Sequence, residues 1–110
     1  MKFPLFFSTL FIVILTCCQP FKYKIPTCIK NKLSEFELQC CEKGANVKEY
    51  KFQGDNVYVF DRGTCGADMT SQVFSEDCIS LGYLGGITGN YKIQGEDFAN
   101  AEFKTTCWEK

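Results

Sequence analysis

The spacing of apolar residues predicts one helix near the start of the chain. Ile29, Leu33 and Phe36 recur at intervals of four and three residues, which is typical of one face of a helix. Thr27 precedes them and is a candidate N-cap, because its hydroxyl could accept a hydrogen bond from the first turn. The helix is expected to end near Leu38.

Two β-rich runs follow a turn at residues 44–46. Residues 47–52 (VKEYKF) and 56–61 (NVYVFD) are rich in β-branched and aromatic residues. Gln53-Gly54-Asp55 separates them, and a short connection with glycine between two such runs indicates a hairpin. We therefore expect two antiparallel strands here.

The rest of the chain continues in short elements. In chain order they are a loop at 62–69, a short strand at 72–74, an acidic turn at 75–77, a glycine-rich strand with a bulge or tight corner at 79–87, a helical or turn segment at 97–100 and an alternating closing strand at 102–108. One helix on a small, mostly antiparallel sheet of four or five strands is an α+β domain.

The first residues have the pattern of an export signal. Lys2 precedes an apolar run from Phe3 to Leu15, as in a secretory signal peptide. The run is shorter than the ~20 apolar residues that a spanning helix needs, so a permanent transmembrane helix is the weaker interpretation. The expected organisation is a signal peptide at 1–17, a lipid-anchor tether at 18–27 and one α+β domain at 28–110.

The end of this segment resembles the lipobox of bacterial lipoproteins. Leu15-Thr16-Cys17-Cys18 places a leucine three residues before a cysteine, and in the motif that cysteine is alkylated by diacylglycerol. Alignment on Leu15 makes Cys18 the lipid-attachment residue, whereas alignment on Ile14 selects Cys17. An ordinary signal peptide without lipid stays open. The resemblance implies an exported protein anchored to the bacterial cell envelope, on its periplasmic or outer surface.

Composition excludes several classes of function. Hydrophobic residues make up 45% of the 110 residues and charged residues 23%, which argues against a disordered chain. The net charge of −1 gives no reason to expect nucleic acid as a partner. The chain has no histidine, which excludes Ser-His-Asp and Cys-His catalysis and any His-ligated metal site. We therefore expect no enzyme activity, no cofactor and no metal.

The remaining six cysteines are candidates for disulfides in an exported chain, where oxidation is favoured. They are Cys28, Cys40, Cys41, Cys65, Cys78 and Cys107, and six cysteines allow fifteen connectivities. The pair expected first is Cys65–Cys78, thirteen residues apart across a turn-rich stretch. The other bonds are expected to tie Cys28 and Cys107 to the adjacent pair Cys40 and Cys41, which should face different partners.

Other motifs have a structural interpretation. The glycines of residues 82–89 lack the Gly-Lys-Ser/Thr of a phosphate loop, and we interpret them as conformational. The acidic pairs at 76–77 and 96–97 lack EF-hand spacing and are interpreted as turn residues. Aromatic residues on the predicted strands are expected in the core, with a binding face on the solvent side as the alternative; they are Tyr50, Phe52, Tyr58, Phe60, Tyr83 and Trp108.

Several motifs follow one another along residues 28–108: Cys28-Ile29 at the helix start, a V-x-x-Y-x-(Y/F) strand at 47–52, a V-Y strand at 57–58, a cysteine loop at 63–68 and a GG-x-x-G segment at 85–89. In this order, and with a lipobox before them, they resemble a family of small uncharacterised bacterial lipoproteins. The resemblance implies a lipid-anchored, exported domain and no particular activity. Cys41 and Cys107 are additions to the family pattern.

The leading functional hypothesis is a non-enzymatic binding or structural module of the cell envelope. The lipid on Cys18 would attach it to the membrane, and the glycine-rich loop with exposed aromatics would contact an unknown protein or small-molecule ligand. The alternative is a secreted, disulfide-rich protease inhibitor or effector, with Arg62 in the loop 62–65 entering a basic-specific pocket. A hydrolase that uses Asp61 and Asp68 is a third hypothesis.

Overall fold

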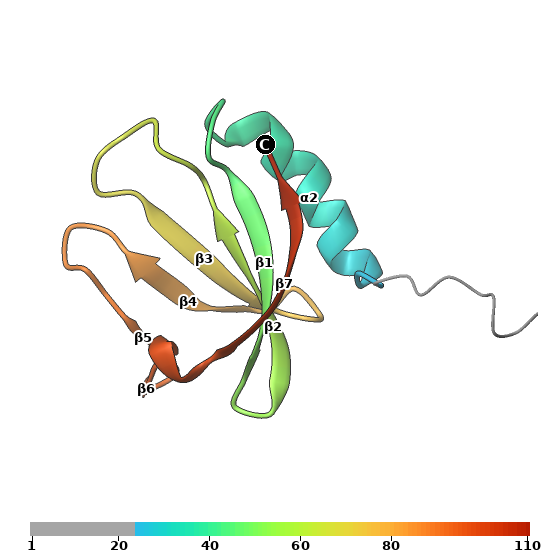
Figure 1. Cartoon of the computed structure of the whole chain (residues 1–110), viewed down its shortest axis with the longest axis vertical. Helices are drawn as coiled ribbons and strands as arrows, with labels where there is room; N and C mark the ends of the chain where they lie inside the picture. Colours follow the sequence, from blue (N-terminus) through green and yellow to red (C-terminus); the bar gives the residue numbers. More distant parts are fainter. Residues whose placement is uncertain (1–23) are drawn as a thin grey trace, which may run out of the picture.

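The computed structural model describes residues 24–110 and packs one helix against an antiparallel sheet of five strands (Figure 1). The elements are helix α2 (Thr27–Gln39) and strands β1 (Asn46–Phe52), β2 (Asp55–Asp61), β3 (Thr70–Ser75), β4 (Ser80–Gly85) and β7 (Glu102–Glu109). The spatial order is β4-β3-β2-β1-β7, and every neighbouring pair is antiparallel. The expected α+β fold is confirmed.

The predicted signal peptide at 1–17 and the lipid-attachment candidates Cys17 and Cys18 lie outside the described residues. Within residues 24–110, no helix has the length and apolarity needed to cross a membrane.

The predicted hairpin forms β1 and β2. Phe52 pairs with Asp55, so that Gln53 and Gly54 alone make the turn. Both have positive φ, 53° and 85°, as the mirror-image turns of tight hairpins require, and glycine adopts such a φ without strain. The loop at 62–69, the strand around 72–74, the turn after Ser75 and the closing strand are confirmed as well.

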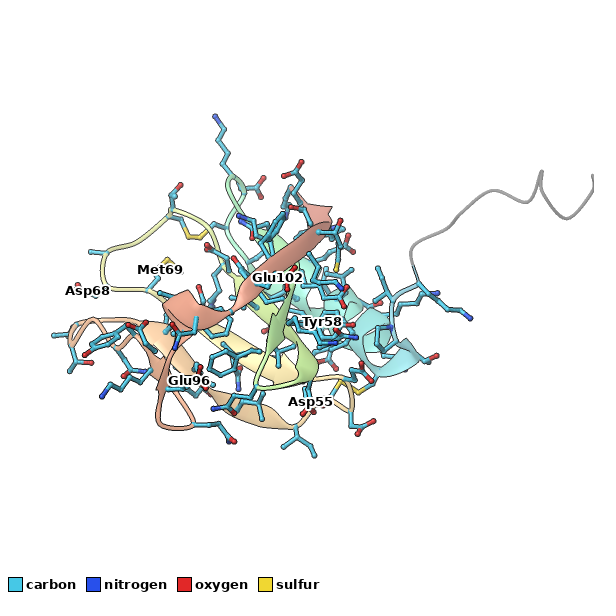
Figure 2. The ribbon with its side chains drawn as sticks, turned by 60° about the horizontal axis from the view of Figure 1, so that its bottom comes forward. Asp55, Tyr58, Asp68, Met69, Glu96 and Glu102 are labelled. Carbon is cyan, nitrogen blue, oxygen red and sulfur yellow. A yellow bond between two sulfur atoms is a disulfide. The ribbon has the colours of Figure 1, made fainter. Side chains whose placement is uncertain are left out.

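The first face of the sheet packs on α2, and we call it the helix face. Val47, Tyr58, Phe60 and Phe74 form its buried core together with Ile29 of the helix. Figure 2 shows Tyr58 on the side of the sheet that faces α2. The apolar period of the helix therefore points at the sheet, as predicted.

The second face is buried under the segment that links β4 to β7. This segment contains β5 (Lys92–Ile93), β6 (Glu96–Asp97) and the 3-10 helix η2 (Phe98–Asn100). Ile93 joins Phe52, Val57, Val59 and Val73 in a second core cluster on this face. Because both faces are covered, residues 57–60 of β2 are all buried, in place of the alternation of a half-exposed strand.

Two predictions are wrong, one about the N-cap of the helix and one about the alternation of side chains along the closing strand. Thr27 is the first residue of α2 and makes no cap; Pro26 holds the N-cap position, which has no side-chain hydrogen bond. The alternation predicted for 102–108 also fails, because β7 has register shifts where it pairs with Val47/Lys48 and Glu49/Tyr50. As a result, the adjacent residues Cys107 and Trp108 both pack against the core of the helix face.

The predicted cysteine pairing is wrong. The disulfides are Cys28–Cys78 and Cys41–Cys65, and Cys107 takes part in neither. Cys65 and Cys78 cannot meet because they lie at opposite ends of β3, a strand of six residues that spans about 20 Å. The Cα atoms of a disulfide lie within about 7 Å of each other. Sequence proximity was therefore a poor guide to the pairing.

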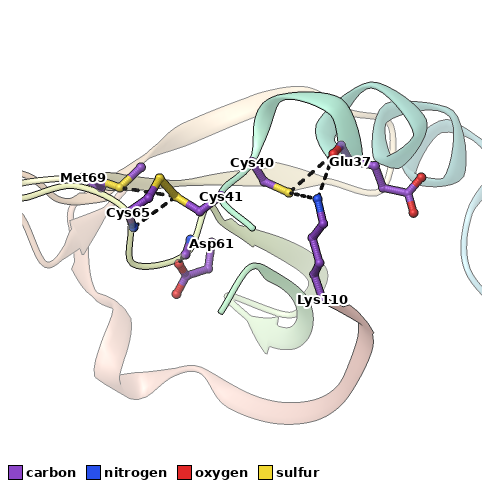
Figure 3. The surroundings of a disulfide bond; sticks show 8 residues. Glu37, Cys40, Cys41, Asp61, Cys65, Met69 and Lys110 are labelled. Atoms are coloured by element: carbon purple, nitrogen blue, oxygen red, sulfur yellow. Dashed lines mark hydrogen bonds between the residues drawn. A yellow bond between two sulfur atoms is a disulfide. The ribbon is translucent and has the colours of Figure 1, made fainter. Parts of the chain in front are cut away.

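The adjacent cysteines do face different partners, as expected. Cys41 forms the disulfide with Cys65, whereas the thiol of Cys40 lies 3.8 Å from Nζ of Lys110 and 3.7 Å from the carbonyl oxygen of Glu37 (Figure 3). The loop 62–69 is thus pinned to the chain just after α2.

Candidate functional site

A groove opens on the helix face between α2 and strands β3 and β4, and we call it the helix–sheet groove. It has a volume of about 150 Å³. Its floor is aromatic: the ring of Phe60 lies 5.1 Å from that of Phe36 and 5.3 Å from that of Phe74, both edge-on. Tyr83 of β4 lines the groove and is 49% exposed.

The groove exists because the helix covers only part of its face. Figure 1 shows α2 beside β1 and β7, and Phe36 also packs edge-on against Trp108 of β7. The helix face of β3 and β4 therefore extends beyond the helix. Gln72 and Tyr83, which pair across these two strands, line the groove there.

Charged side chains surround the aromatic floor. Nζ of Lys32 lies 4.6 Å from the centre of the Phe74 ring, a cation–π contact. Arg62 lines the groove from the end of β2 and is exposed, and Glu35 of α2 is the acidic residue of the lining. The groove thus combines an apolar floor with two cations, an arrangement suited to an apolar group that carries a negative charge.

Two exposed loops lie beside each other at one end of the sheet, and we call them the distal loops. They are residues 62–69 and 86–91. The N–H of Gly86 donates to the carbonyl of Met69 at 3.2 Å, which joins the two loops. Figure 1 shows them at the end of the sheet opposite the start of α2. Ile87 is 84% exposed at the tip of the second loop, so the glycine-rich segment does present an apolar side chain to solvent.

The base of the loop 62–69 is held by backbone contacts as well as by its disulfide. The carbonyl of Arg62 accepts the N–H of Cys41 at 2.9 Å, and the Asp61 carboxylate accepts the N–H of Gly63 at 2.9 Å. A Cβ on Gly63 would lie 2.5 Å from the carbonyl oxygen of Lys43, so only glycine fits there. Asp61, a candidate of the hydrolase hypothesis, is engaged in this turn.

A buried polar cluster lies elsewhere on the helix face, and we call it the Glu49 cluster. Glu49 of β1 is 3% exposed and pairs across the strands with Tyr58, whose hydroxyl donates a hydrogen bond to the carboxylate. Burial raises the pKa of Glu49, while the charge of Lys104 and the Tyr58 hydrogen bond act in the opposite direction. Oε1 of Glu49 accepts no hydrogen bond.

The same carboxylate affects its neighbours. Burial raises the pKa of the Cys107 thiol to about 11, and the charge of Glu49 adds to the shift. Burial, followed by the charges of Glu49 and Glu76, also raises the pKa of Tyr58. Neither group therefore ionises at neutral pH, and Cys107 is a poor nucleophile in the folded protein.

Asn56 and Glu76 complete the Glu49 cluster. Nδ2 of Asn56 donates to Oε2 of Glu76 at 3.0 Å, and Oδ1 of Asn56 is buried with no hydrogen bond. Sequence reasoning missed Glu49. The available signal was its predicted hairpin position, on the same face as Val47, where a buried residue was expected. Among residues 24–110, no three His, Cys, Asp or Glu side chains come together as a metal site.

Most of the aromatic candidates belong to the core. Phe52, Tyr58 and Phe60 are buried, and Tyr50 and Trp108 pack against the two core clusters. Tyr83 is half exposed and lines the groove, so it is the aromatic residue of this set that is best placed to contact a ligand. The other five serve the packing of the core.

Comparison with known proteins identifies the family. The chain belongs to the family described as Domain of unknown function (DUF6970), whose model matches residues 34–110. The matched range contains all five strands of the sheet and both distal loops. No curated protein and no solved structure matches the chain. The two disulfides indicate an extracytoplasmic domain.

The buried carboxylate predicts a pH-dependent effect of Glu49→Gln. Because the pKa of Glu49 is raised in the folded state, Glu49 contributes most to the free energy of unfolding below its pKa in the unfolded chain. This contribution is lost as the pH rises through its pKa in the folded protein. In EDTA, the free energy of unfolding of the wild type should therefore fall relative to Glu49→Gln as the pH is raised above 4.5, the ordinary glutamate value.

Urea unfolding across this pH range measures the effect, with the exposed Glu109→Gln as the matched control. The control should follow the wild type. A difference between Glu49→Gln and wild type that does not change with pH would contradict the assignment of a raised pKa.

Proposed function

We propose that this protein is a non-enzymatic, lipid-anchored binding module of the bacterial cell envelope. Its ligand is a small molecule or side chain with an apolar body and an anionic group, held in the helix–sheet groove. The observation that carries the ligand part of the proposal is the aromatic floor of the groove, with Lys32 and Arg62 at its border. The distal loops lie at the end of the sheet opposite the start of α2 (Figure 1). A domain tethered at the start of α2 would direct these loops away from the membrane.

The anchor part of the proposal rests on the sequence. The segment at 1–17 has the pattern of a signal peptide, and Cys18, with Cys17 as the alternative, follows the lipobox-like Leu15-Thr16. Two acyl chains on one cysteine hold a protein to a bilayer far better than one chain does. The extracytoplasmic disulfides support export.

The ligand class follows from the groove. The rings of Phe36, Phe60 and Phe74 offer an apolar surface, and Lys32 and Arg62 supply positive charge at its border. A volume of about 150 Å³ suits a group of roughly one ring, since pockets for drug-sized molecules are larger. Glu35 in the lining disfavours ligands with several negative charges.

The alternative function is protease inhibition by the loop 62–65. Its support is an exposed segment at 64–68 that the Cys41–Cys65 disulfide pins at its base. The carbonyl of Arg62 is engaged by the N–H of Cys41, however, and a protease must reach the carbonyl of the residue in its specificity pocket. We therefore favour the groove over the loop.

Anchoring predicts that the protein carries palmitate through Cys18. In cells grown with labelled palmitate, the full chain should be labelled and Cys18→Ala should lose the label, while Cys40→Ala serves as the matched control and keeps it. If Cys17→Ala loses the label and Cys18→Ala keeps it, the lipid is attached to Cys17. An unlabelled wild-type protein contradicts lipid anchoring and leaves the groove part of the proposal to its own test.

Ligand binding predicts that phenylacetate occupies the groove more tightly than its neutral analogue phenethyl alcohol. Titration followed by NMR should shift the ring resonances of Phe36, Phe74 and Tyr83. Arg62→Gln should weaken phenylacetate binding a few-fold, as expected for one exposed ion pair. The exposed Lys92→Gln, outside the groove, is the charge-matched control and should bind as the wild type does.

Absence of any shift at these rings, or equal binding of the charged and neutral probes, would contradict the proposed ligand class.

A further inference from the structure

Within residues 24–110, two buried side-chain atoms of nitrogen or oxygen lack a hydrogen-bond partner, and both are acceptors. They are Oε1 of Glu49 and Oδ1 of Asn56. Leaving a buried acceptor without a donor costs about 1–3 kcal/mol, and more for a charged group. The two residues lie on the same face of the β1–β2 hairpin, where one partner from outside the protein chain would satisfy both acceptors.

Strand register brings the two atoms together. Glu49 pairs with Tyr58 and Lys51 pairs with Asn56, so all four side chains lie on the helix face. Glu49 and Asn56 are therefore diagonal neighbours, a relation that separates residues by about 7–8 Å across an antiparallel pair. Side chains of this length can both reach one small ion, whose oxygen ligands lie at about 2.3–2.6 Å if the ion is Ca²⁺.

Existing contacts orient both oxygens. The Tyr58 hydroxyl engages the Glu49 carboxylate, and Nδ2 of Asn56 donates to Oε2 of Glu76 at 3.0 Å, so that Oε1 of Glu49 and Oδ1 of Asn56 are the oxygens left without a donor. Glu76 is exposed, so it adds a second carboxylate on the solvent side of the cluster. The charge of Glu76 also raises the pKa of Glu49.

Neighbouring lysines do not replace the missing partner. Lys104 and Lys51 act on Glu49 through their charges, but neither donates a hydrogen bond to Oε1. Both lysines are exposed and so keep their own hydration. Oε1 of Glu49 is therefore a buried acceptor to which no donor of the described residues is bonded.

We propose that the Glu49 cluster is a calcium site, in which Oε1 of Glu49 and Oδ1 of Asn56 bind the ion and the carboxylate of Glu76 completes the protein ligands. Ca²⁺ accepts carboxylate and amide oxygens in flexible geometry and takes water for its remaining positions. With two carboxylates and one amide, the site has the low ligand charge of extracellular calcium modules, which bind at about 0.1–1 mM. It uses none of the residues that line the groove and is independent of the proposed function.

The test is calorimetric titration of the purified, EDTA-treated full chain with CaCl2 at constant ionic strength. The wild type should bind with a Kd of about 0.1–1 mM, and its Tm should rise with CaCl2. Glu49→Gln, which keeps the size of the side chain, should lose at least about tenfold in affinity because it removes a charged ligand. Glu109→Gln, an acidic residue at the end of β7, is the matched control and should bind as the wild type does.

A gain-of-affinity variant keeps the test independent of any folding defect. Asn56→Asp replaces the amide with a carboxylate in the same place and should tighten calcium binding. Terbium gives a second readout, because Tyr58 beside the site should sensitise the emission of bound Tb³⁺, and CaCl2 should displace it.

No binding by the wild type up to about 10 mM CaCl2 would overturn the site, since that concentration exceeds the affinity range of such modules. Unchanged affinity in Glu49→Gln or in Asn56→Asp would overturn it as well.

Discussion

The disulfide Cys28–Cys78 is the constraint on which the rest of the structure depends. It joins the first turn of α2 to the turn between β3 and β4, across a sequence separation of 50. By chain entropy, closing a loop of this length stabilises the folded state by about 4 kcal/mol. The helix needs such a bond because Ile29 is its one fully buried residue. Without α2 in place, the aromatic core of the helix face would be open to solvent.

The two disulfides lie at opposite ends of α2. The helix starts where the N-terminal segment enters and ends beside the second disulfide, Cys41–Cys65, which holds the loop 62–69. The two crosslinks therefore fix opposite ends of one helix. Between them, the part of the helix face that α2 leaves uncovered forms the groove. The two disulfides thus hold the helix that borders the proposed binding groove.

Local patterns predicted the local structure and failed where tertiary geometry decides. The turn at Gln53-Gly54 and the apolar period of α2 were readable because each depends on neighbouring residues. The cysteine pairing was missed because it depends on tertiary structure: Cys65 and Cys78 lie at opposite ends of β3, and each bonds to the segment that lies nearest to it in the fold. The alternation of β7 failed at its bulges, which adjust the strand to β1. Glu49 was missed because burial of a carboxylate depends on cross-strand neighbours and on the cover of the sheet.

Peptide mapping of the purified chain under non-reducing conditions tests the central claim most directly. After alkylation of thiols and proteolysis, mass spectrometry should detect a peptide that links Cys28 to Cys78 and another that links Cys41 to Cys65. These bonds would establish that α2 is fixed at both ends. A peptide that links Cys65 to Cys78 would contradict the account, because that bond cannot form with β3 extended between them.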